Sequence, residues 1–110
     1  MASDQDFVDY VCDQIASAGS VSFRKMFGDY AIYCNGKVVA LVCDNQFFLK
    51  PTESVRAKIE RVVEAIPYPG AKPYFLIDEG LDDREWVSSL VRMTEREIPL
   101  PKPRKKASKS

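Results

Sequence analysis

The chain has 110 residues, of which 45% are hydrophobic, and 16 basic residues balance 16 acidic ones. This size and composition indicate one globular domain with one core and exclude a transmembrane protein, because no apolar run reaches the roughly 18 residues of a membrane span. The N-terminus carries neither a basic segment nor an apolar stretch that would mark it for export, so a cytoplasmic location without membrane contact is expected.

The first expected element is a helix over about residues 4–18, since its apolar residues recur at helical spacing. Ser3 or Asp4 can cap its start and Gly19 can end it. The character of the sequence then changes to β-branched and aromatic runs separated by short turns, which is typical of an antiparallel meander. The four expected strands are 21–27, 30–34, 37–43 and 47–50.

The Asn-Gly pair at 35–36 predicts a two-residue hairpin loop, because a type I′ turn needs positive φ at both central positions. This loop sets Cys34 opposite Lys37, and the same register carried outward places Cys43 opposite Gly28. The two cysteines are then too far apart for a disulfide bond. Free, buried thiols are therefore expected.

The same register predicts a sheet with apolar residues on both faces. A small antiparallel sheet usually has one wet face, so the second face needs a helix, a ligand or another subunit as a cover. Imperfect alternation is one interpretation, and a homodimer is another. The two sets are Tyr30, Ile32, Val39 and Leu41 on one face, and Ala31, Tyr33, Val38, Ala40 and Val42 on the other.

A second helix is expected over about 53–65, with Thr52 as its N-cap. The proline-rich segment 67–73 predicts a loop, and 74–77 predicts a short fifth strand. The apolar residues assigned to one stripe of this helix are Val55, Ile59, Val62, Val63 and Ile66.

Asp82 and Glu85 form an aspartate version of the capping box, which predicts a last helix that runs to about Arg96. The expected order is α-β-β-β-β-α-β-α. This order indicates an α+β fold of two layers, in which three helices pack on an antiparallel sheet of about five strands. The domain is expected to span residues 1–97.

Residues 98–110 mix proline with basic residues and predict a disordered tail. Residues 1–101 carry 11 basic and 16 acidic residues, a net charge of −5, so nucleic acid would be bound weakly and without sequence preference through the tail. A solubilising tail is the alternative. The five basic residues of the tail are Lys102, Arg104, Lys105, Lys106 and Lys109.

Composition also limits the chemistry. The sequence has no histidine, which removes histidine bases, Ser-His and Cys-His nucleophile pairs and the commonest zinc ligand. Its three cysteines have no C-x-x-C spacing. No glycine-rich phosphate motif is present, and the acidic stretch 78–83 lacks the spacing of a calcium loop. We expect no cofactor, no metal and no enzymatic activity. A small-molecule or enzymatic site in the proline loop, with Tyr68 and Lys72, stays as an alternative.

One segment does not follow a packing pattern, namely the run of Arg24, Lys25, Met26, Phe27 and Gly28. On a strand its two adjacent cations point to opposite faces, and the glycine permits a bend or bulge. A charge-protected edge strand is one interpretation. The other is a protein-interaction surface formed by these five residues.

This run, the tyrosine-bearing hairpin around 35–36, the strand at 74–77 and the helix with Trp86 resemble the TfoX N-terminal domain over roughly residues 5–96. Also part of the resemblance is the segment Phe48-Leu49-Lys50-Pro51. The resemblance implies a two-layer fold similar to that of type III secretion chaperones. It further implies a non-enzymatic interaction module, like the N-terminal half of competence regulators that act as coactivators beside a cAMP-receptor-type transcription factor.

Overall fold

The computed structural model describes residues 4–26, 29–59, 61–78 and 80–98. These residues form three α-helices and six strands, so the predicted α+β class and element order are confirmed with one additional strand. The elements are α1 (Gln5–Gln14), the 3-10 turn η1 (Ala16–Ala18), β1 (Val21–Met26), β2 (Asp29–Cys34), β3 (Lys37–Cys43), β4 (Gln46–Leu49), α2 (Glu53–Lys58), β5 (Glu64–Ala65), β6 (Tyr74–Ile77) and α3 (Arg84–Glu97).

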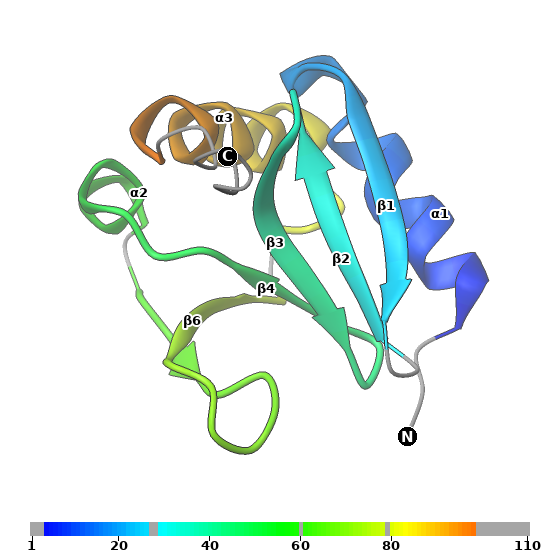
Figure 1. Ribbon diagram of the computed structural model, residues 1–110. Helices are drawn as coiled ribbons and strands as arrows, with labels where there is room; N and C mark the ends of the chain where they lie inside the picture. Colours follow the sequence, from blue (N-terminus) through cyan, green and yellow to red (C-terminus); the bar gives the residue numbers. More distant parts are fainter. Residues whose placement is uncertain (1–3, 27–28, 60, 79, 99–110) are drawn as a thin grey trace, which may run out of the picture.

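The six strands form one antiparallel sheet with the order β1-β2-β3-β4-β6-β5. It is strongly twisted, so that β4 and β6 run across the direction of β1, β2 and β3 (Figure 1). All three helices contribute buried side chains to a single core on one face, called here the helix face. Its fully buried members include Val11 of α1, Val55 of α2, Leu90 of α3, and Phe47 and Phe75 of the sheet.

The predicted Asn-Gly hairpin is confirmed, because Asn35 and Gly36 have φ values of 55° and 83°. Cys34 pairs with Lys37 as expected, but a bulge then shifts the register so that Ile32 pairs with Ala40. The extra residue on β3 is Val39, and both Val39 and Ala40 are buried in the core.

The shift corrects two predictions. Cys43 reaches the level of Asp29 and not of Gly28, and its thiol donates a hydrogen bond to the Asp29 carboxylate. Leu41 lies with Ala31 on the face opposite the helices, whereas the unbulged register placed it with Ile32. Conversely, Ala40 and Val42 pair with Ile32 and Tyr30 and belong to the core under the helices, although they were predicted to share a face with Ala31. Nothing in the sequence around Val39 marks a bulge, because no glycine or proline stands there.

The second helix is much shorter than predicted. The Thr52 hydroxyl caps its start by accepting the Val55 N–H at 3.4 Å, but α2 ends at Lys58 and not near residue 65. Ile59, the residue after the helix, is extended, and the Leu76 N–H donates to the Val63 carbonyl at 2.8 Å just before β5. β-Branched residues are better suited to strands than to helices, and β6 offers them an unpaired edge. The predicted apolar stripe over 53–65 is therefore wrong beyond its first turns.

The last helix begins one residue later than the predicted cap implied. Asp83, not Asp82, accepts the Trp86 N–H at 3.1 Å. Buried hydrogen bonds connect α1 with α3 and with the turn before it. The Ser88 hydroxyl of α3 donates to the Gln14 carbonyl at 2.8 Å, and the Gln14 side-chain amide donates to the carbonyl of Leu81, in the turn, at 3.1 Å. These bonds satisfy groups that would be costly to bury alone.

The face opposite the helices, called here the second face, is also apolar. Ala31, Cys43 and Phe48 lie on it and are at most 5% exposed, although no helix of the described residues covers them. Tyr74 belongs to the same face, and the pKa of its hydroxyl is raised by burial and by the nearby Tyr68 and Cys43. The second face is thus partly buried within the chain itself.

In the described ranges, no helix combines the length and the apolar character needed to cross a membrane. α3 has 14 residues and carries charged residues in its first and last turns.

The three thiols are free, as expected. Burial, the largest cause in each case, raises the pKa of all three, to about 11 for Cys12 and Cys43. For Cys43 the Asp29 carboxylate adds to the increase, both through its charge and by accepting the thiol proton in a hydrogen bond. Protonated thiols are poor nucleophiles, so these cysteines are inert near neutral pH.

We expect the free energy of unfolding to fall as the pH rises from 9 towards 11. In this window the unfolded chain loses the Cys43 proton at its ordinary pKa of 9.0, while the folded chain retains it up to about 11. The unfolded state binds fewer protons, so stability falls by up to about 1.4 kcal/mol per pH unit for this thiol. Urea unfolding at about pH 8, 9 and 10 measures the slope.

The matched control for this prediction is Cys43→Ser, which keeps a hydrogen-bond donor for Asp29 but has no group that titrates in this range. Its slope should be shallower than that of the unmodified chain. Equal slopes in the two proteins would show that Cys43 is not the titrating group.

Candidate interaction surface

Strand β1 forms one edge of the sheet, with β2 as its neighbour. The Ser20 carbonyl accepts a hydrogen bond from the Asn35 N–H at 2.8 Å, which makes Val21 a position that is not hydrogen-bonded across the pair. By alternation, the backbone N–H and C=O groups of Phe23 and Lys25 also point away from β2. The edge therefore presents a row of backbone donors and acceptors.

The two cations of β1 lie on opposite faces of the sheet. Arg24 pairs with Ala31 on the second face, and Lys25 pairs with Tyr30 on the helix face. Both side chains are exposed, and neither makes an ion pair or hydrogen bond with any described residue. The strand therefore carries two adjacent positive charges that are uncompensated by the described part of the chain.

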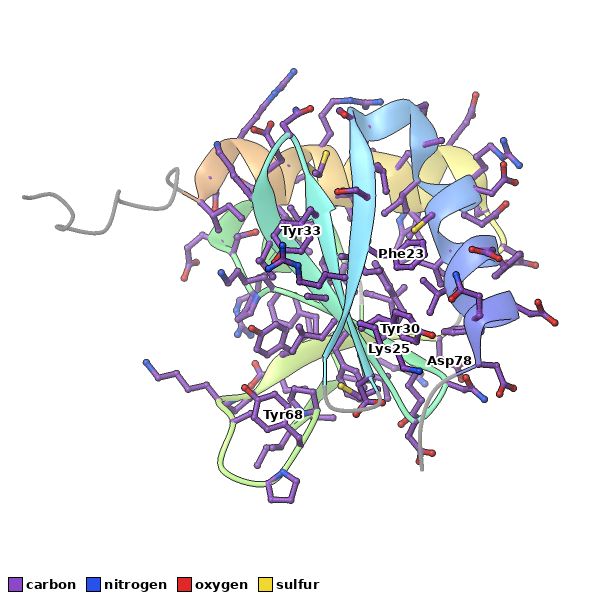
Figure 2. All side chains as sticks on the ribbon, turned by 45° about the vertical axis from the view of Figure 1, so that its right-hand side comes forward. Phe23, Lys25, Tyr30, Tyr33, Tyr68 and Asp78 are labelled. Atoms are coloured by element: carbon purple, nitrogen blue, oxygen red, sulfur yellow. The ribbon has the colours of Figure 1, made fainter. Side chains whose placement is uncertain are left out.

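An aromatic side chain accompanies these cations. Phe23 is 38% exposed and packs edge-on against Tyr30, with 5.6 Å between ring centroids. Figure 2 shows both rings on the side of the sheet that faces α1, and Tyr33 on the other side. The edge thus combines backbone hydrogen-bonding groups, positive charge and apolar surface.

Of the remaining predicted site residues, the structure describes only the backbone of Met26. Met26 is the last residue of β1 and pairs with Asp29 through its backbone. Phe27 and Gly28 lie outside the described residues, and so do the five basic tail residues from Lys102 to Lys109. The predicted tail, 98–110, is outside them from residue 99 onward.

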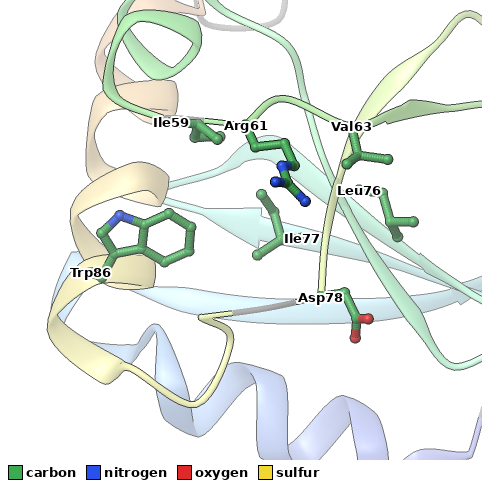
Figure 3. Close-up of a pocket in the computed structure, with 7 residues that line it drawn as sticks. All are labelled: Ile59, Arg61, Val63, Leu76, Ile77, Asp78 and Trp86. Carbon is green, nitrogen blue, oxygen red and sulfur yellow. The ribbon is translucent and has the colours of Figure 1, made fainter.

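A cavity that sequence reasoning missed lies near the other edge of the sheet (Figure 3). It has a volume of about 420 Å³, and its walls come from the segment after α2, from β6 and from the start of α3. The helix predicted over 53–65 gave no sign of this cavity, because it assigned Ile59 and Val63 to one apolar stripe of a continuous helix. The described lining residues are Ile59, Arg61, Val63, Leu76, Ile77, Asp78 and Trp86.

The sequence also raised the proline loop 67–73 as a site. Neither this cavity nor a smaller one of about 190 Å³ beside Arg56 and Phe75 is lined by the proline loop 67–73. Within the described ranges, no three His, Cys, Asp or Glu side chains gather in a way that could hold a metal ion.

A family model described as the TfoX N-terminal domain matches residues 13–98. The chain belongs to this family. An uncharacterised 12.7 kDa protein from the trpE 5′ region of Spirochaeta aurantia is 39% identical over 110 residues, which cover 100% of this chain and 96% of that protein. The TfoX resemblance predicted from the sequence is therefore confirmed.

The match places both candidate sites inside the TfoX N-terminal domain. It extends from the end of α1 to the residue after α3, and so includes the β1 edge and all the lining residues of the cavity that the structure describes. Membership indicates a domain like the N-terminal domain of competence regulators, without assigning a partner.

Proposed function

We propose that this TfoX N-terminal domain acts by protein contact and not by catalysis, and that it binds an acidic, extended segment of a transcription regulator along the edge of β1. The single observation that carries the proposal is the edge itself, which has outward backbone groups beside two cations that no described residue pairs with. The experiment that tests it is partner capture with β1 variants.

The backbone groups of β1 suit the addition of another strand. Phe23 and Lys25 offer outward N–H and C=O groups at the spacing of an antiparallel or parallel neighbour. In strand addition, main-chain hydrogen bonds supply affinity, while side chains on alternating faces supply specificity. Phe23, already partly exposed, provides an apolar contact on one of these faces.

The positive charges of Arg24 and Lys25 favour an acidic segment as the bound partner. Residues 1–101 have a net charge of −5, yet Arg24 and Lys25, on opposite faces of the same edge strand, make no ion pair with any described residue. An acidic segment would be attracted to this edge, with a faster association rate and a marked dependence on salt. The same cations discourage uncontrolled pairing between identical edges, since a register with Arg24 across from Arg24 is repulsive.

Homodimerisation through the second face has weaker support than strand addition. Ala31, Cys43 and Phe48 are already buried in the single chain, so a second copy has less apolar surface to cover there than the sequence suggested. The homodimer stays a prediction.

The test compares the unmodified tagged protein with four variants in capture experiments from the cells that make it. The double variant Arg24→Glu/Lys25→Glu should lose the partner, since both attractive charges become repulsive. The control Lys58→Glu/Lys72→Glu makes the same charge change at exposed positions away from β1 and should retain it. If the β1 double variant keeps every partner, the proposal is wrong.

A third variant distinguishes the contribution of the Lys25 backbone N–H to binding from that of its side-chain charge. Lys25→Pro removes an outward N–H without removing a β1–β2 hydrogen bond, so the fold should survive while strand addition fails. Lys25→Ala removes the charge but keeps the N–H, and should weaken binding less than proline does. Equal binding by the proline and alanine variants would exclude strand addition as the mode of contact.

A further inference from the structure

The backbone of β1 determines which side chains of an added strand would lie beside which of its own. Val21, Phe23 and Lys25 turn their N–H and C=O groups away from β2, so the backbone hydrogen bonds of an added strand form at these three positions. Residues directly opposite each other in two paired strands project on the same face of the sheet. Phe23, Arg24 and Lys25, all exposed, therefore each lie beside one definable position of a bound segment.

The direction of an added strand follows from the sheet that it joins. Every strand pair among the described residues is antiparallel, and antiparallel pairing is slightly more stable per residue than parallel pairing. A segment bound antiparallel to β1 passes Lys25 first, then Arg24 and then Phe23. The order of these three side chains along β1 thus determines the order of three residues in the segment.

Arg24 favours an acidic residue on the second face. It pairs with Ala31, which is apolar and 3% exposed, and its neighbour on that face of β1 is the exposed Ser22. No described carboxylate forms an ion pair with the Arg24 guanidinium. A glutamate opposite Arg24 can accept two parallel hydrogen bonds from this group. Opposite charges across two strands are stabilising and like charges are destabilising, so this position distinguishes an acidic segment from a basic one.

The helix face suits an apolar residue beside Phe23 and an acidic one beside Lys25. The Phe23 ring is 38% exposed and packs edge-on against Tyr30, whose hydroxyl donates to the Gln5 side-chain oxygen of α1 at 3.4 Å. Tyr30 is 4% exposed, so Phe23 lies against a buried ring and leaves its outer surface open to a β-branched or aromatic side chain. Lys25 lies on the same face (Figure 2) and forms no ion pair with a described residue.

We propose that the β1 edge binds segments in which two acidic residues are followed by a β-branched or aromatic one, with the segment antiparallel to β1. The first acidic residue pairs with Lys25, the second pairs with Arg24, and the apolar residue packs against Phe23. This inference rests on the strand addition proposed above and adds the sequence and the direction of the bound segment. An antiparallel segment with the apolar residue first or in the middle makes at most two of these three contacts in any register.

A synthetic peptide tests the segment directly. Acetyl-Thr-Thr-Glu-Glu-Val-Thr-Thr-amide should bind the unmodified protein at low salt with a Kd of roughly 0.1–1 mM, because a short segment must be ordered on binding. Amide NMR spectra of the isotope-labelled protein measure this affinity. The largest shifts should be those of the Phe23 and Lys25 N–H groups, since these gain hydrogen bonds to the peptide.

Exchanging charges between protein and peptide establishes the register. Arg24→Glu should bind the peptide with Glu-Lys-Val at its centre, and Lys25→Glu the one with Lys-Glu-Val, each within roughly twofold of the original pair. Each variant should bind the other exchanged peptide at least roughly threefold more weakly, since two like-charge pairs then form. The two variants have the same net charge, and so do the two peptides, so only the order of the charges differs.

Phe23→Ala tests the apolar contact. Replacing the valine of the original peptide by serine should weaken binding to the unmodified protein by roughly threefold or more. The valine and serine peptides should bind Phe23→Ala alike, because the ring that distinguishes them is gone. Far-UV circular dichroism of each variant establishes that it is folded before binding is compared.

The inference is overturned if each charge variant binds both exchanged peptides equally, or if a peptide with Val-Glu-Glu at its centre binds more tightly than the original one. It is also overturned if no peptide binds at about 5 mM. In all three cases the proposed function stands as long as Arg24→Glu/Lys25→Glu loses the captured partner. If that double variant retains the partner, the proposed function and this inference fail together.

Discussion

Replacing Phe47 by alanine should lower the free energy of unfolding by about 3–5 kcal/mol, the usual cost of truncating a buried phenylalanine. Phe47 is fully buried on β4, where it pairs with Val42 and Ile77 and belongs to the core under the helices. Truncation removes apolar burial and leaves a cavity that β4, with strands on both sides, cannot collapse to fill. Urea unfolding at low temperature gives the value, because a loss of this size is a large share of a domain's total stability.

Phe23→Ala is the matched control for this substitution. Phe23 is 38% exposed on the β1 edge, so the same change should cost about 1 kcal/mol or less. A loss below about 1 kcal/mol for Phe47→Ala would contradict the core described here, since it would mean that the side chain is not packed between sheet and helices.

Gly80→Ala should be the second strongest substitution, with an expected loss of about 2–4 kcal/mol. Two costs act together. Gly80 has a φ of 91°, which L side chains rarely adopt, and the new methyl group would lie 2.5 Å and 2.8 Å from two ring carbons of Trp86. The indole must move to relieve the contact, so a shift of its emission maximum should accompany the loss of stability.

Gly70→Ala measures the cost of placing an alanine at a positive φ without any close contact. Gly70 has a similar φ of 88°, but nothing lies within 4 Å of the position that its Cβ would take. This substitution should cost about 1–2 kcal/mol, the penalty of the left-handed conformation alone, and leave the tryptophan emission unchanged. If Gly80→Ala and Gly70→Ala lower the free energy of unfolding equally, the Trp86 indole moves aside at no cost, and close packing does not hold it in place beside the cavity.

Sequence reasoning succeeded where structure is determined by neighbouring residues. The hairpin at 35–36, the Thr52 cap and the strand at 74–77 depend on local backbone chemistry, and all three are present. The resemblance to the TfoX N-terminal domain was likewise carried by short motifs and is supported by the family match.

The failures share a different origin, since each depends on distant residues. The residues after Lys58 fit a helical apolar stripe, but pairing with β6, at separations of nine positions or more, decides the conformation of the residues from Val63 to Ala65. The bulge at Val39 has no local marker and is visible only through the pairing with β2. Consequently the cationic run on β1 could be predicted as a candidate site, whereas the cavity, which exists because α2 stops early, could not.

The bonds between α1 and α3 constrain the order in which the domain can be completed during synthesis. Gln14 and Ser88 are separated by 74 positions, and the buried apolar face of α1 shares its core with Leu90 and Val91. Until α3 leaves the ribosome, the emerging chain has the strands of the sheet and an amphipathic N-terminal helix but lacks α3, which packs against both. The domain is therefore completed by packing its two ends together, and a nascent chain that stops before residue 84 leaves exposed the part of the apolar face of α1 that α3 covers.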